Sequence, residues 1–314
     1  MTGRLAPDDI SPVSLGRHAL RTRELLAVLA LAFSLPSSAV SQVALETTPA
    51  RPARGMLIRL TVTPTLTDLV SGMAGEVAEE PLHFQSGNGG ISWTALAPVP
   101  VEGGDSLPIL LYLTHGGRTD TIHTAIGVSQ PGYPSEKLTV APKMAEPDSA
   151  GRVRIKQDVA RAREVSRAAH QTARLWEDGF ALPRKSRITS EFGTGREYNG
   201  KVTSRHMGTD FNGKVGDPIV ATNRGRVALV APFYLAGNVV YLDHGEGLVS
   251  GYFHLSKALV KTGDMVEKGQ VIGRVGRTGR VTGPHLHWIM RYGGVTLDPM
   301  SVVSLLNNSV SGER

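Results

Sequence analysis

Residues 184 to 300 are a series of short runs rich in β-branched residues, and glycines or turn dipeptides separate one run from the next. PIVATNRGRVALVA, NVVYLDHG, LVSGYFHL and QVIGRVG are examples of these runs. Runs of this length that end at turn residues are typical of strands joined by tight turns. We therefore predict an antiparallel β domain over residues 184–304, followed by a flexible tail over 305–314.

A second group of short strands is predicted over residues 42–151. MLIRLTVT places Met56, Ile58, Leu60 and Val62 on one face, and LPILLYL, TDTIHTAIGV and KLTVA follow with turn residues between them. Several short strands at this spacing, without a helical period, favour an accessory β-sandwich of immunoglobulin-like type. Its histidines at 83, 115 and 123 lack metal-ligand spacing, so we expect packing or surface roles for them. The chain is thus expected to be mainly β.

The two β regions are separated by a predicted linker helix over residues 152–183. Apolar residues recur there at three- and four-residue steps, namely Val159, Ala162, Val165, Ala169, Ala173 and Trp176. This is the pattern of one face of an amphipathic helix, and Gly179 and Pro183 mark its expected end.

The N-terminal residues 1–41 have the layout of a secretory signal. Arginines precede the apolar run LLAVLALAFSL, and small residues follow it in SSAVS. Cleavage near Ala39 or Ser41 is expected, and an uncleaved signal anchor is the alternative. The apolar run is shorter than the roughly 20 residues of a membrane span. We therefore expect an exported protein in the periplasm, the cell envelope or the medium, with no membrane span beyond a possible anchor.

Charge is unevenly distributed along the chain. Residues 42–151 hold 6 basic and 11 acidic side chains, whereas residues 184–300 hold 16 and 9. A basic domain suits an acidic substrate, or it could dock against the acidic sandwich. Only 5% of the residues are aromatic and no nucleic-acid module is recognisable, so a nucleic-acid partner is not expected. The sequence carries no indication of the oligomeric state.

Candidate metal ligands occur in two motifs of the C-terminal domain. In GPHLHW, His285 and His287 are two residues apart, so in a strand they share one face. In RHMGTDFNG, His206 and Asp210 are four residues apart, and the glycines predict a bent loop or strand rather than a helix. The chain has no cysteine, which excludes cysteine-ligated zinc and a cysteine nucleophile. Two imidazoles and a carboxylate, with a fourth position left for water, describe a catalytic zinc site.

RHMGTDF, YFHLS and TGPHLHW, in that order, resemble the signature of the lysostaphin/LytM-type zinc metallopeptidases, which cut peptide bonds in bacterial peptidoglycan. The resemblance covers about residues 187–302 and does not extend to the sandwich or the helix. It implies that His206, Asp210 and His287 bind Zn2+ and that His285 and His254 are catalytic. It also implies that the partner is a peptidoglycan peptide.

The chemistry of the residues is compatible with those roles. The chain lacks the HExxH motif, which supplies a glutamate base in metallopeptidases of the thermolysin type. A neutral histidine beside the metal is the natural substitute for that base. Either His285 or His254 can take this part. Asn199 and Asn238 are candidates for holding substrate backbone, with turn formation as the alternative.

Two other functions are considered. The run KTGDMVEKGQVIGRVGRTG resembles the hairpins of biotinyl and lipoyl carrier domains, but no suitably flanked tip lysine is present. A catalytically inactive LytM-like activator or scaffold of other cell-wall hydrolases is the second alternative. All five candidate residues are present, which favours a zinc-dependent endopeptidase that hydrolyses peptidoglycan cross-links.

Overall fold

The computed structural model describes residues 42–66, 69–200 and 202–308. The predicted signal lies outside these residues. No helix in the described part of the chain is long and apolar enough to cross a membrane.

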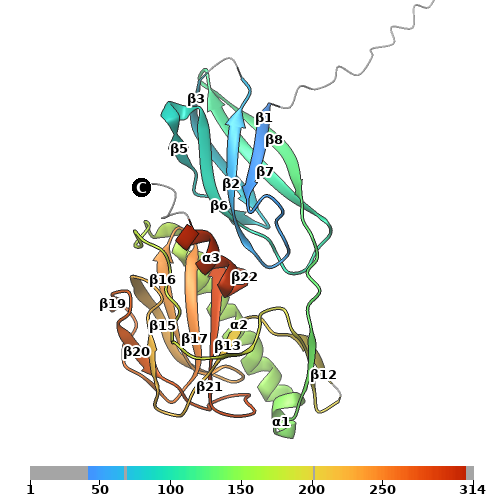
Figure 1. Cartoon of the computed structure of the whole chain (residues 1–314), viewed down its shortest axis with the longest axis vertical. Helices are drawn as coiled ribbons and strands as arrows, with labels where there is room; N and C mark the ends of the chain where they lie inside the picture. The colour runs from blue at the N-terminus through green and yellow to red at the C-terminus, as the bar shows by residue number, and fades with distance from the viewer. Residues whose placement is uncertain (1–41, 67–68, 201, 309–314) are drawn as a thin grey trace, which may run out of the picture. The chain divides into compact units, whose positions relative to one another are not determined.

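The N-terminal region is a sandwich of two four-stranded antiparallel sheets, as predicted (Figure 1). One sheet has the order β1 (Val43–Thr48), β2 (Leu57–Pro64), β6 (Ser92–Pro98) and β5 (Gln85–Gly87). The other has the order β4 (Glu80–Pro81), β3 (Val70–Val77), β7 (Ser106–His115) and β8 (Arg118–Gly127). Ile58, Leu60 and Val62 are fully buried between them, in accordance with the period of two in the sequence.

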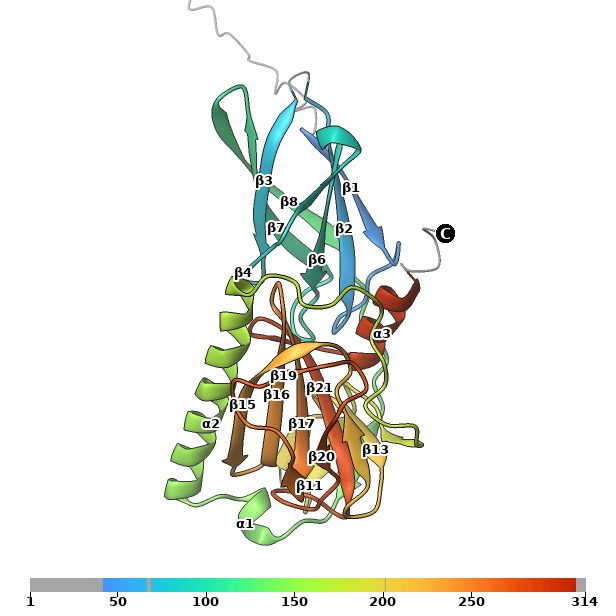
Figure 2. The same ribbon diagram turned by 90° about the vertical axis from the view of Figure 1, so that its left-hand side faces the viewer.

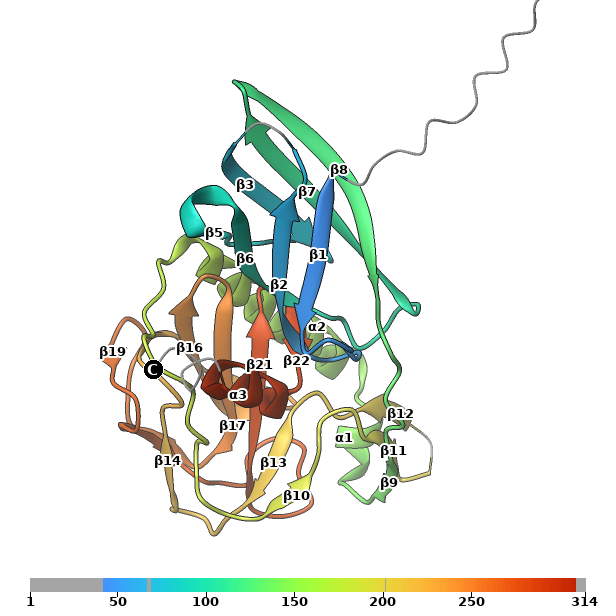
Figure 3. The ribbon, with the colours of Figure 1, turned by 45° about the horizontal axis from the view of Figure 1, so that its top comes forward.

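The C-terminal region is built on an eight-stranded sheet (Figure 3). Its order is β10 (Ile188–Ser190), β13 (Thr209–Asn212), β21 (His285–Tyr292), β17 (Leu248–Leu255), β16 (Gly237–Gly245), β15 (Gly225–Phe233) and β19 (Met265–Val266), with β22 (Val295–Leu297) paired to β21. A smaller sheet contains β14 (Pro218–Val220), β20 (Val271–Arg274) and β18 (Lys257–Ala258). Another contains β12 (Val202–Arg205), β11 (Gly195–Tyr198) and β9 (Ser135–Leu138).

Helices cover parts of this sheet. The long helix α2 (Ser149–Ala168) stands alongside it, and its Ala162 packs with Leu229 and Ile289 of the sheet (Figure 2). Asp148 caps the N-terminus of α2, because its side chain accepts a hydrogen bond from the backbone N–H of Gly151 at 2.7 Å. A short helix α1 (Pro142–Ala145) precedes α2, and α3 (Pro299–Asn308) follows the last strand. Two 3-10 turns lie at Asn88–Gly90 and Ala169–Gln171.

The sandwich and the C-terminal region belong to one compact unit. Hydrogen bonds join them, since Asp298 N donates to Gly55 O at 2.7 Å and the Tyr292 side-chain OH donates to Pro81 O at 2.9 Å. The buried side chains of both regions also form one continuous apolar cluster. Removal of residues 42–151 would therefore expose part of the C-terminal core.

Three sequence-based expectations differ from the structure. KLTVA was expected to add a strand to the sandwich, but β9 pairs in parallel with β11 of the C-terminal region. The linker helix ends at Ala168, because the chain turns there through the 3-10 segment rather than continuing to Gly179, and Val159 on its expected apolar face is 51% exposed. Residues 305–308 are not a tail, since Leu305 and Leu306 of α3 are buried.

Candidate active site

The pairing of β13 with β21 brings the two candidate motifs together. Asp210 lies opposite His287 and Asn212 lies opposite His285 in the antiparallel register. Because successive side chains of a strand point to opposite faces, Asp210, His285 and His287 share one face, while Trp288 points into the core and is fully buried. The alternation in GPHLHW therefore places both histidines beside the carboxylate.

His206 reaches the same place from the loop between β12 and β13. Its backbone N donates to Thr194 O at 2.7 Å, and its O accepts from Gly193 N at 2.8 Å. The chain then passes so close to β21 that a Cβ at Gly208 would lie 2.7 Å from Cε1 of His287. A glycine between His206 and Asp210 is thus required by close approach.

Three potential ligand atoms converge at this point. Nε2 of His206 lies 3.0 Å from Oδ1 of Asp210 and 2.9 Å from Nδ1 of His287, and the last two atoms are 2.7 Å apart. In the described residues this is the one group of three or more such side chains whose geometry could hold a metal ion. The sequence-based grouping of His206, Asp210 and His287 is therefore reproduced in space.

Neighbouring groups orient these atoms. Nδ1 of His206 donates to the carbonyl of Glu191 at 2.9 Å, which leaves a lone pair on Nε2. Oδ2 of Asp210 accepts from the guanidinium of Arg196 at 2.7 Å, which leaves Oδ1 directed at the histidines. Lone pairs of Nε2 and Oδ1 that face one another favour a cation between them.

The protonation states are those of ligands. Burial raises the pKa of Asp210, but the contacts of its Oδ1 with the imidazoles of His206 and His287 outweigh this and hold the pKa well below its ordinary value. Burial lowers the pKa of His287 to about 4, despite the opposing effect of Asp210. At neutral pH the carboxylate is ionised and the His287 imidazole is neutral, as metal ligation requires.

The two predicted catalytic histidines lie beside this group. Nδ1 of His285 donates to Gly283 O at 2.9 Å, and Nδ1 of His254 donates to Thr278 O at 2.8 Å. Both rings therefore have Nε2 free to accept a proton. Nε2 of His285 lies 3.7 Å from Oδ1 of Asp210. The ring centroids of His254 and His285 are 4.8 Å apart. His254 has a positive φ of 61°, a strained conformation for a residue with a Cβ.

The model for peptidase family M23 matches residues 204–299. This segment contains His206, Asp210, His254, His285 and His287. The C-terminal domain belongs to peptidase family M23.

Two relatives are similar to this chain in sequence, and one solved structure shares its fold. The peptidoglycan DD-endopeptidases ShyA and ShyC of Vibrio cholerae are 37% and 39% identical, over 48% and 40% of this chain and 37% and 30% of their own lengths. The chain thus spans about a third of the length of these relatives. A crystal structure of a candidate M23 peptidase from Pseudomonas aeruginosa shares the fold, with a TM-score of 0.58 and 24% identity over 81% of this chain and 96% of that one.

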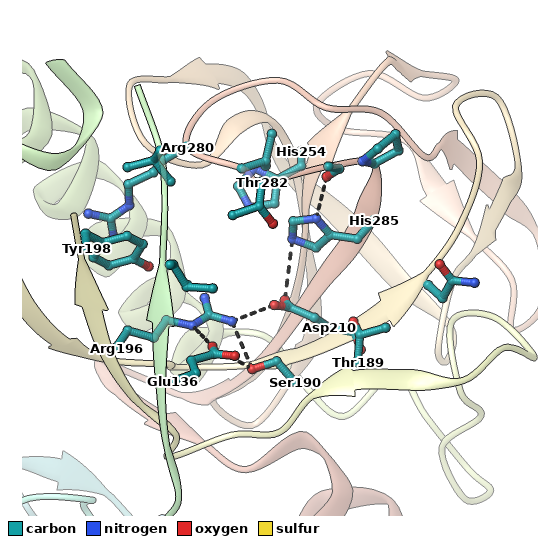
Figure 4. Close-up of a pocket in the computed structure, with 16 residues that line it drawn as sticks. Glu136, Thr189, Ser190, Arg196, Tyr198, Asp210, His254, Arg280, Thr282 and His285 are labelled. Carbon is teal, nitrogen blue, oxygen red and sulfur yellow. Dashed lines mark hydrogen bonds and ion pairs between the residues drawn. The ribbon is translucent and has the colours of Figure 1, made fainter. Parts of the chain in front are cut away.

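A polar pocket of about 230 Å3 opens onto the candidate site of the M23 domain. Asp210, His254 and His285 line one side of it, and Arg196, Tyr198 and Arg280 are labelled across from His285 in Figure 4. Glu136 and Leu138 of β9, in the segment between the sandwich and α2, also line it. The pocket of the M23 domain is therefore completed by a segment outside the matched residues.

Sequence reasoning did not identify Arg196. It lies between Ser190 and Glu136, donates to Glu136 Oε1 at 2.6 Å and holds the outer oxygen of Asp210 (Figure 4). In GREY, Arg196 and Tyr198 are two residues apart and so share one face of a strand that precedes RHMGTDF. This alternation is the sequence signal that could have indicated further pocket residues beside the candidate ligands.

The side chains of the two asparagines are bonded to backbone groups. The side chain of Asn199 accepts from Val140 N and donates to Val140 O, both at 2.9 Å, and its φ of 53° is that of a turn. The side chain of Asn238 donates to Leu255 O at 3.0 Å. Neither residue lines the polar pocket.

Proposed function

We propose that this chain is a zinc-dependent endopeptidase that hydrolyses peptide cross-links of bacterial peptidoglycan. The observation that carries the proposal is the convergence of Nε2 of His206, Oδ1 of Asp210 and Nδ1 of His287, flanked by two further imidazoles with free Nε2 atoms. The substrate class is supported by the M23 relatives named as peptidoglycan DD-endopeptidases.

The residues fit zinc. His and Asp supply nitrogen and oxygen ligands, and three of them leave a fourth position for water, as in catalytic rather than structural zinc sites. Bound there, the ion would lower the pKa of its water to about 7 and polarise the scissile carbonyl. The three atoms are now 2.7 to 3.0 Å apart, so we expect them to separate by a few tenths of an ångström around an ion.

The side chains of the protein transfer the proton and orient the reacting groups. His285 accepts the proton of the attacking water at Nε2, because its Nδ1 is already committed to Gly283 O. The same proton then passes to the leaving amine. His254, whose Nδ1 donates to Thr278 O, likewise presents Nε2 as an acceptor and assists the proton transfer as the second histidine. Arg196 holds Oδ2 of Asp210 throughout and so keeps Oδ1 directed at the histidines.

The experiment is digestion of purified sacculi by the full chain alone, with mass spectrometry of the released fragments in the presence and absence of a chelator. We expect chelator-sensitive release of peptide fragments. His285→Ala should retain zinc and lose turnover, and His123→Ala, on an exposed position of β8, serves as the matched control. An inactive activator would bind sacculi but release no fragments without a partner hydrolase, and that outcome would refute the proposal.

A further inference from the structure

Arg280 is a partly buried cation on the loop between β20 and β21. Its guanidinium lies over the ring of Tyr198, 4.1 Å from the ring centroid. In the described part of the chain no carboxylate lies within ion-pair distance of it, whereas the neighbouring Arg196 has both Glu136 and Asp210. All five of these side chains line the polar pocket (Figure 4).

The loop that carries Arg280 is fixed in place. Arg280 N donates to Leu235 O at 2.8 Å, and Thr278 Oγ1 donates to Leu255 O at 3.0 Å. The same loop supplies the Thr278 and Gly283 carbonyls that orient the two catalytic histidines. Arg280 is therefore held in a constant relation to the reacting groups.

The Tyr198 platform is also rigid. Tyr198 is the last residue of β11, opposite Leu138 of β9, and it packs with Val140 and Ala145. A guanidinium stacked on a fixed aromatic face loses little side-chain entropy when it binds a planar anion.

The charges of the pocket identify the ligand. Glu136 and Asp210 are both bound to Arg196, so among the described residues Arg280 is the cation of the pocket without a carboxylate partner. We propose that Arg280, stacked on Tyr198 and facing the catalytic histidines across the pocket, binds a free carboxylate of the peptide substrate. The proposal rests on the proposed function and makes the enzyme selective for cross-links with a free carboxylate near the scissile bond.

The test compares two soluble cross-linked muropeptides that differ only in whether their α-carboxylates are free or amidated. For the wild-type chain we expect kcat/KM to be about 10- to 100-fold higher for the free form, the range of one charge-assisted hydrogen bond. Arg280→Gln should remove this preference by slowing only the free form. Arg277→Gln, an exposed arginine three residues away, should keep it. Arg280→Lys should keep part of it, because the charge remains without the planar fork.

Equal cleavage of the two muropeptides by the wild-type chain, or equal slowing of both by Arg280→Gln, would overturn the proposal. Titration of the two intact cross-linked muropeptides into the His285→Ala chain separates failure of this proposal from failure of the proposed function. If neither muropeptide is cleaved but the free form binds about 10-fold more tightly through Arg280, the endopeptidase proposal fails and the carboxylate site stands.

Discussion

Two clusters in this molecule are made of the same residue types, a buried carboxylate with an arginine and two histidines. The Asp210 cluster consists of Asp210, Arg196, His206 and His287, and the Glu80 cluster consists of Glu80, Arg167, His170 and His83. Asp210 is 5% exposed and Glu80 is 1% exposed. Composition and burial therefore do not distinguish them.

The geometry of the histidines does distinguish them. In the Glu80 cluster, Nε2 of His170 faces Glu80 Oε2 at 3.1 Å and its Nδ1 faces Nε2 of His83 at 2.9 Å. Opposite edges of one ring are used, so the cluster is a chain of hydrogen bonds. In the Asp210 cluster the ligand atoms meet at one point. The first arrangement joins the sandwich to the end of helix α2, whereas the second can hold an ion.

The largest expected difference concerns the metal. Asp210→Asn should lose most of its zinc and all measurable release of fragments, because a charged ligand is replaced by a neutral amide. Glu80→Gln, the matched change in the other cluster, should keep zinc. Elemental analysis after dialysis against metal-free buffer measures this. Equal zinc loss in both variants would mean that the clusters do not differ as described.

The next effect is on stability. Glu80→Gln removes the charge between Arg167 and His170, and we expect the free energy of unfolding to fall by about 2 to 3 kcal/mol. This is below the full cost of a broken buried pair, because the Arg167 side chain is 48% exposed. Tm should fall by roughly 5 to 10 °C in thermal denaturation.

Glu79→Gln is the control for this measurement. Glu79 lies 3.8 Å from the same arginine, but its side chain is 90% exposed. Loss of the Glu79 charge should lower the free energy of unfolding by less than about 1 kcal/mol. If both variants shift Tm equally, burial of Glu80 is not what gives the cluster its strength.

A smaller difference is expected for the two arginines. Arg196→Lys replaces the guanidinium that orients Asp210, and zinc affinity should fall by about 10- to 100-fold in competition with a chromogenic chelator. Arg167→Lys should leave the affinity unchanged. An unchanged affinity in Arg196→Lys would mean that Asp210 is oriented without this arginine.

The sequence predicted the three ligand residues of the Asp210 cluster, but neither Arg196 nor the Glu80 cluster, for a physical reason. His285 and His287 share a face by strand alternation, and His206 and Asp210 are close along the chain, so local patterns placed four of the groups. Glu80, His83 and His170 come from a two-residue strand, a loop and a 3-10 turn, and only tertiary packing brings them together. The pairing of β9 with β11 was missed likewise, because KLTVA alternates as a sandwich strand would and its partner lies about 60 residues later.

The last comparison uses pH and applies to the Glu80 cluster. Burial raises the pKa of Glu80, but hydrogen bonds from His170 and Arg167 outweigh this and keep the pKa below its ordinary 4.5. Because the folded pKa is the lower one, the ionised group contributes stability that is fully present above pH 4.5 and is lost as pH falls through the folded pKa. The stability gap between wild type and Glu80→Gln should therefore narrow between about pH 5 and pH 3 in metal-free urea unfolding. Since Asp210 is intact in both proteins, its titration cancels in this difference. A gap that stays constant over that range would show that the charge of Glu80 does not stabilise the junction.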